Sequence, residues 1–161
     1  TGLQRTVLET WSGLMYFIVP TGFMQGRRLG RGLLLAYLLH FVVAVIGVVL
    51  ATRAWPQIRD DFRLNFTWFV AATFLILPYS FLYDLVMLQL VLALWHKDAE
   101  MLFGAEEKYS NYLWIFCWFS PFLSWAIVSS TKFQFMPFLL MFILWRLGSL
   151  NQEEPSVHKT A

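Results

Sequence analysis

The sequence predicts an all-α, polytopic integral membrane protein with about four transmembrane helices and an N-terminal amphipathic helix at the membrane interface. Hydrophobic residues make up 58% of the 161 residues and charged residues only 14%, whereas soluble domains carry about 25% charged residues. The mean hydropathy is +0.58. The apolar residues fall into long stretches separated by short charged segments, as expected of helices that cross a bilayer.

Composition divides the chain into an interfacial segment, a membrane domain and a tail. Residues 1–24 form the interfacial segment, because their apolar residues recur on one helical face, a pattern typical of helices that lie on a membrane surface. The same pattern would suit a helix packed on a partner subunit. Residues 25–150 form the transmembrane helical domain, and residues 151–161 form a polar tail that we expect to be loosely ordered. The apolar interfacial residues are Leu3, Val7, Trp11 and Leu14.

The first apolar stretch, residues 32–52, predicts a transmembrane helix with a packing face. A bilayer core of about 30 Å requires about 20 apolar residues in a helix, and this stretch has no charged residue. Small residues recur on the same helical face as His40, and such residues let helices approach closely. We therefore expect this face to contact protein rather than lipid. Its small residues are Ala36, Ala44, Gly47 and Ala51.

The second apolar stretch, residues 64–95, contains Asp84 as its one charged residue. As a single helix it would measure about 48 Å, which is too short for two passages through the bilayer core. We expect one long, tilted helix near residues 66–92, kinked near Pro78, which has no backbone N–H. Trp68 and Trp95 would then lie near the two opposite interfaces, where indole rings concentrate.

The third apolar stretch is long enough for a hairpin. The polar segment at residues 129–132 divides it into expected helices near residues 110–130 and 133–149. Four spans place the N-terminus, the 96–108 loop and the C-terminus on one side, with eight basic residues against four on the other. This excess predicts that the first side faces the cytoplasm or the matrix. The tryptophans expected to anchor the spans at the interfaces are Trp68, Trp95, Trp114 and Trp145.

Asp84 and His40 form a candidate intramembrane polar pair. In the expected topology they lie at similar depth on antiparallel helices, so a hydrogen bond between them would satisfy both. An ionisable residue inside a membrane is a functional-site hypothesis by default. Structural contact between helices, a proton or ion path, and a ligand contact all remain open as roles for the pair.

The sequence carries no catalytic, metal or cofactor motif. The G-x-S-x-G, H-E-x-x-H, P-loop and G-x-G-x-x-G patterns are missing. Cys117 is the single cysteine, which excludes an internal disulfide and a Cys/His zinc site. His40 could ligate a haem or chlorophyll, but His96 and His158 lie at or beyond the interface and offer no second ligand at its depth. We therefore expect no catalytic residues, no metal and no cofactor.

These observations favour an accessory, non-catalytic subunit of a larger membrane complex, such as a respiratory or other bioenergetic complex. Its expected partners are other membrane subunits and membrane lipids, in a mitochondrial inner membrane or a bacterial cytoplasmic membrane. The net charge of +2 gives no argument for nucleic-acid binding. One alternative is a small oligomeric transporter or channel component that uses Asp84 and His40. A further alternative is a pigment- or haem-binding membrane protein.

Overall fold

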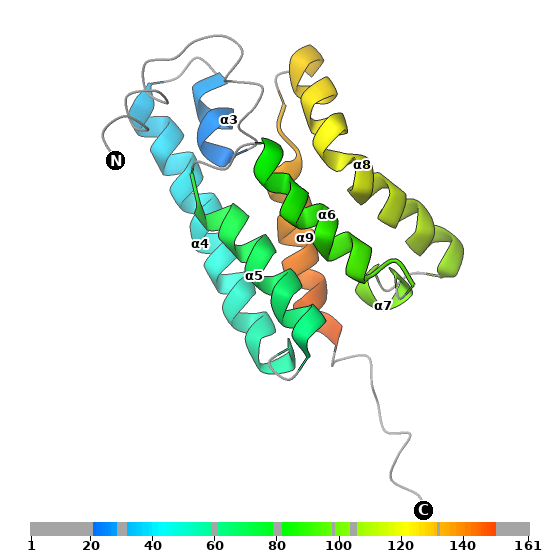
Figure 1. Cartoon of the computed structure of the whole chain (residues 1–161). Helices are drawn as coiled ribbons and strands as arrows, with labels where there is room; N and C mark the ends of the chain where they lie inside the picture. Colours follow the sequence, from blue (N-terminus) through cyan, green and yellow to red (C-terminus); the bar gives the residue numbers. More distant parts are fainter. Residues whose placement is uncertain are drawn as a thin grey trace, which may run out of the picture.

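The computed structural model describes residues 21–28, 32–58, 61–78, 82–97, 99–103, 106–131 and 133–150 (Figure 1). Within these ranges every regular element is a helix, which confirms the all-α class. Residues 1–20 of the expected interfacial helix and the whole 151–161 tail lie outside the described residues. The helices are α3 (Gly22–Arg28), α4 (Leu33–Ile58), α5 (Phe62–Ile76), the 3₁₀ helix η1 (Leu82–Leu85), α6 (Val86–Leu94), α7 (Ala99–Phe103), α8 (Glu107–Thr131) and α9 (Met136–Ser149).

Helix lengths support two of the four expected spans. In the described part of the chain, two helices are long and apolar enough to cross a bilayer, over Leu33–Pro56 in α4 and Glu107–Thr131 in α8. The apolar helices α5 and α9 have 15 and 14 residues. At 1.5 Å per residue these shorter helices measure about 21–23 Å, less than the bilayer core of about 30 Å.

The second apolar stretch is two antiparallel helices, so the predicted single helix over residues 66–92 is wrong. Helix α5 ends at Ile76, and Leu77 adopts an extended conformation with φ −75° and ψ 123°. Proline disfavours the helical conformation for the residue before it and donates no hydrogen bond itself, so Pro78 ends the helix instead of kinking it. The chain then returns through η1 and α6 beside α5 (Figure 1).

This reversal places Trp68 and Trp95 at the same end of the bundle. The indole Nε1 of Trp95, just after α6, donates to Oγ1 of Thr67 near the start of α5 at 2.8 Å. We call this the Trp95 end, where α4, α6 and α9 finish and α5 and α8 begin (Figure 1). The opposite end, where α5 finishes and α4, α6 and α9 begin, is the Pro78 end.

The reversal also overturns the expected division of basic residues. The Cζ atom of Arg63 lies 5.0 Å from the ring centroid of Trp95. Arg63 and the residues that follow Trp95 are therefore at one end, although the expected topology placed Arg63 and Lys97 on opposite sides. The count of eight against four basic residues depended on an uninterrupted second helix, and it no longer applies.

Close packing joins α4 to α3 and α5. A Cβ atom built at Gly47 would lie 3.0 Å from Cβ of Leu75 in α5. A Cβ atom built at Gly26 in α3 would lie 2.6 Å from the backbone Cα of Ala36. Glycine is required where backbones approach this closely. Helix α4 also pairs extensively with α9, whereas α8 contacts α7 and, less extensively, α6 and α9.

Candidate functional site

His40 completes the broken end of α5. Its Nε2 lies 3.0 Å from the carbonyl oxygen of Ile76, and since a carbonyl only accepts, Nε2 carries the hydrogen. The helix ends at Ile76, so this carbonyl has no donor from a following turn of α5. The imidazole supplies that donor and ties the first turns of α4 to the break before Pro78. His40 is 7% exposed, and its Nδ1 has no hydrogen-bond partner among the described residues.

The face of α4 that contains His40 lies toward neighbouring helices. Ala36, Gly47 and Ala51 are buried and Ala44 is half-buried. Ala36 faces α3 and Gly47 faces α5, as their close approaches show. Small-residue spacing was the sequence signal for this face, because small side chains allow short distances between helix backbones.

Asp84 lies at the turn of the α5–α6 hairpin, in η1 and immediately before the N-cap of α6. This position places its carboxylate near the positive end of the α6 dipole, which favours a negative charge. Asp84 is half-buried and lines a pocket of about 350 Å³ with six residues of α5, the turn and α6. The other lining residues are Phe69, Val70, Thr73, Phe74, Leu77 and Met87.

His40 and Asp84 line different pockets. The pocket at His40 measures about 400 Å³ and includes Ile76 and Pro78, whereas the pocket at Asp84 includes Leu77. The two pockets share no lining residue. Both ionisable side chains lie beside the α5–α6 break, and His40 donates its hydrogen bond to the backbone carbonyl of Ile76.

Three of the four expected anchor tryptophans join helices at the Trp95 end. Trp68 donates to Ala51 O at 2.8 Å, and Trp114 donates to Leu92 O at 2.7 Å. Trp95 is 0% exposed and donates to Thr67 as described above. Trp145 differs, because 55% of its surface is exposed.

A polar cluster at the Pro78 end was not anticipated from the sequence. The Ser124 hydroxyl donates to Oε1 of Gln134 at 2.7 Å, and the backbone N–H of Gln134 donates to Oε1 of Gln25 at 2.8 Å. The Thr21 hydroxyl donates to Pro78 O at 3.0 Å. These bonds connect α3, α8, the start of α9 and the break after α5. The sequence feature that could have indicated this cluster is Gln134, a polar residue between apolar residues.

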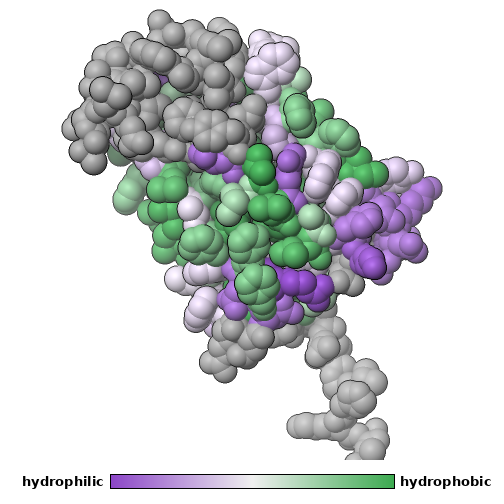
Figure 2. All heavy atoms as spheres, in the orientation of Figure 1, coloured by the Kyte–Doolittle hydropathy of each residue, from purple (hydrophilic) through white to green (hydrophobic). Residues whose placement is uncertain are grey.

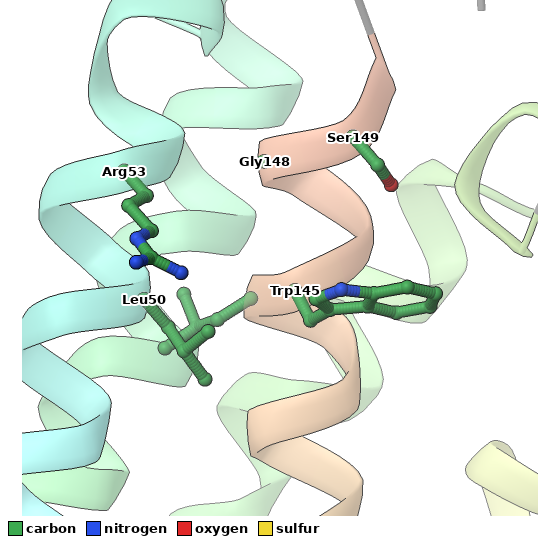
Figure 3. A pocket seen from close by; sticks show the side chains of 6 residues that line it. Leu50, Arg53, Trp145, Gly148 and Ser149 are labelled. Atoms are coloured by element: carbon green, nitrogen blue, oxygen red, sulfur yellow. The ribbon is translucent and has the colours of Figure 1, made fainter. Parts of the chain in front are cut away.

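A pocket of about 150 Å³ between α4 and α9 was also missed (Figure 3). Figure 3 shows the Arg53 side chain extending from α4 toward α9. The Trp145 indole extends from α9 away from α4, with its nitrogen on the edge nearer to α4. Sequence reasoning used Arg53 only in counting charges. The lining residues are Leu50, Arg53, Leu144, Trp145, Gly148 and Ser149.

The described residues contain no group of three or more His, Cys, Asp or Glu side chains that could hold a metal ion. The site features are thus a capped helix break, two pockets beside it, and a basic pocket at the Trp95 end. Comparison of the chain with protein-family models, with curated proteins and with solved structures finds no match in any of the three.

Proposed function

We propose that this chain is an accessory subunit of a larger membrane complex, embedded in the bilayer and packed against other membrane proteins. The observation that carries the proposal is the apolar exterior of the two long helices. Only 17% of the most apolar window of α4 and 28% of that of α8 are buried within the fold. The core helix of a soluble protein would be mostly buried, so these faces require lipid or partner protein.

Figure 2 supports this proposal at the level of the molecular surface. Hydrophobic residues gather across the middle of the visible face, and hydrophilic residues gather mainly toward the lower edge and one side. A band of apolar surface beside a polar end is the distribution that a bilayer stabilises.

The outward face of α4 suits lipid. Its exposed large side chains are predominantly aliphatic, and aliphatic side chains resemble acyl chains in polarity. Phe41 is the one aromatic residue among those in the central part of the helix. The exposed large residues between positions 34 and 49 are Leu34, Leu38, Phe41, Val42, Val45, Ile46, Val48 and Val49.

The outward face of α8 suits a partner protein. Its exposed side chains are predominantly aromatic, and aromatic residues are enriched at protein interfaces and dominate their binding energy. The opposite, buried face carries the small polar residues Ser110, Ser120 and Ser124. The exposed aromatic residues of α8 are Tyr109, Tyr112, Phe116, Phe119, Phe122 and Trp125.

In this proposal α4 and α8 cross the membrane, and α9, which at about 21 Å is shorter than the bilayer core, runs beside α4 across most of it. The α5–α6 hairpin enters from the Trp95 end and returns to it. The second span of the sequence-based topology, near residues 66–92, is thereby replaced by a hairpin of two shorter helices, α5 and α6. The proposed setting is a bioenergetic complex of a mitochondrial inner membrane or a bacterial cytoplasmic membrane.

Site-specific photocrosslinking in native membranes tests the proposal. A photoreactive phenylalanine analogue at Phe119 on α8 should give a protein adduct of one defined mass. The same analogue at Val45 on α4, which is comparably exposed, should give no protein adduct because lipid covers that face. Purification from native membranes should recover the Phe119-linked chain in a stoichiometric complex. A monodisperse monomer without adducts at either position would contradict the accessory role.

One observation favours a transporter component as a second candidate. The α5–α6 hairpin consists of two helices of 15 and 9 residues with His40 and Asp84 beside the break between them, and discontinuous helices form ion and substrate sites in transporters. In that case Asp84→Asn should abolish ion flux in liposomes while the protein remains folded. An accessory subunit should show no flux in either form.

A further inference from the structure

The pocket between α4 and α9 changes polarity along the helix axes. The two helices run in parallel and in register, because a Cβ atom at Gly148 would lie 3.8 Å from Cα of Ala54 while Leu50 and Leu144, one turn earlier, line the same pocket. Leu50 and Leu144 form its apolar part, toward the middle of the bundle. Arg53 and the residues after Trp145 form its polar part, toward the Trp95 end (Figure 3).

Two groups offer donors to an anion in this pocket. Arg53 is the first charged residue after the apolar run of α4, so it marks the depth at which the apolar surface ends. Trp145 contributes an indole N–H on the α9 side. The Ser149 hydroxyl is already engaged, since it donates to Arg146 O at 2.9 Å and accepts from Arg146 Nη1 at 3.3 Å.

We propose that this pocket binds the phosphate of an anionic phospholipid. The guanidinium of Arg53 pairs with the phosphate, for which its planar donors are well suited, and the Trp145 indole N–H provides a second donor. The glycerol and acyl chains continue along Leu50 and Leu144 toward the middle of the bilayer. This inference rests on the proposed membrane embedding, and it adds a specific ligand to it.

The order of polarity along the pocket favours a lipid over a free anion. A phospholipid presents its phosphate at the interface and its hydrocarbon one helical turn deeper, and the pocket presents Arg53 and Leu50 in that order. A free phosphate would gain nothing from the apolar half.

Native mass spectrometry of the full chain in detergent, with added phosphatidylglycerol, phosphatidylcholine or inorganic phosphate, tests the site. We expect preferential retention of phosphatidylglycerol. Arg53→Gln should weaken that binding by about five- to tenfold, because one charge-assisted contact is lost. Trp145→Phe, which keeps the ring and removes the N–H, should weaken it by about threefold. Lys108→Gln, an equal change of charge on exposed Lys108 of α8, is the matched control and should have no effect.

Equal binding by Arg53→Gln and Lys108→Gln would overturn the lipid site. Competition by inorganic phosphate as effective as by phosphatidylglycerol would overturn the lipid assignment and leave an anion site. Circular dichroism checks the fold of each variant. If Arg53→Gln loses helicity, Trp145→Phe and Arg53→Lys take its place. Lipid binding at the wild-type level by both of these variants would overturn the site. Alkaline extraction of membranes separates this test from that of the proposed function. Release of the wild-type chain would refute membrane embedding, whereas retention with unchanged lipid affinity in Arg53→Gln would refute only the lipid site.

Discussion

At the scale of single residues, a histidine and an aspartate in apolar sequence are explained by one break in a helix. The carbonyl of Ile76 loses its helical donor at the break, and His40 replaces that donor at 3.0 Å. Asp84 follows the break and lies near the N-terminus of α6, where a carboxylate is favoured. Each residue thus has a local reason for its position, in addition to any role in ion or ligand binding.

Replacing His40 should destabilise the protein more than a change on the exposed face of α4. His40→Leu leaves the Ile76 carbonyl without a donor, at an expected cost of about 1–3 kcal/mol. Thermal unfolding in detergent measures this cost. Phe41→Leu, next in sequence and exposed, is the control and should shift the melting temperature little. Equal shifts in both variants would show that the capping bond contributes nothing.

A double-mutant cycle on His40 and Asp84 decides whether the two residues are coupled. Because they line separate pockets, we expect the losses of His40→Leu and Asp84→Leu to add within about 0.5 kcal/mol. The measurement is chemical or thermal unfolding of the two single variants and the double variant. A double variant that loses clearly less than the sum would show that the two residues are coupled, as the sequence predicts.

At the scale of helices, glycine and tryptophan determine which helices come together. Glycines allow α3 and α5 to approach α4, and tryptophans donate hydrogen bonds across the Trp95 end from α5, α6 and α8. Helices in a bilayer gain little from hydrophobic burial against each other, since lipid is equally apolar. In the proposed bilayer setting, close packing and buried hydrogen bonds therefore decide the pairing.

A graded series of Gly→Ala variants should follow the space available at each position. The built Cβ lies 2.6 Å from backbone at Gly26, 3.0 Å from a side chain at Gly47 and 3.8 Å from its nearest neighbour at Gly148. Overpacking should cost about 1–3 kcal/mol at Gly26 and less at Gly47, and Gly148→Ala should be neutral because alanine also favours helix. Gly32→Ala, with nothing within 4 Å, is the control. Melting temperatures that do not follow this order would contradict the described packing of α3 and α5 on α4.

Trp95 should be essential to the hairpin and Trp145 should not. Trp95→Phe removes the buried donor to Thr67 between α6 and α5, with an expected loss of about 1–3 kcal/mol. Trp145→Phe, at an exposed position, should leave unfolding in lipid-free detergent unchanged. Similar losses in both variants would mean that ring volume, rather than the hydrogen bond, stabilises the hairpin.

At the scale of the whole molecule, the reversal at Pro78 changes the end of the bundle at which the later helices begin and finish. Helices α4 and α9 run in parallel, so the start of α4 and the end of α9 lie at opposite ends of the bundle (Figure 1). An aliphatic outer face on α4 and an aromatic outer face on α8 then give the molecule two different sides, one suited to lipid and one to a partner.

Accessibility labelling should place residues 32 and 150 on opposite sides of the membrane. Single cysteines at Gly32 and Leu150, in a Cys117→Ala background, should react with a membrane-impermeant reagent from opposite sides of sealed vesicles. The physical reason is the parallel course of α4 and α9. Labelling of both positions from one side would contradict this arrangement and support the topology with four full spans.

The sequence by itself determined the helical class, the extent of the first and third apolar stretches, and the small-residue face of α4. These features follow from local periodicity and composition, because the pattern of apolar residues determines which face of a helix lies against apolar surroundings. Tertiary structure alone decided that residues 64–95 reverse direction, that Trp68 and Trp95 share one end, and that Arg53 and Trp145 line one pocket. Proline indicates that a helix is interrupted, but the direction of the chain after it depends on which distant groups complete the broken backbone. Here those groups are His40 from α4, 36 positions before Ile76, and Thr67 for Trp95, 28 positions away. Contacts across such separations leave no periodic signal in a single sequence.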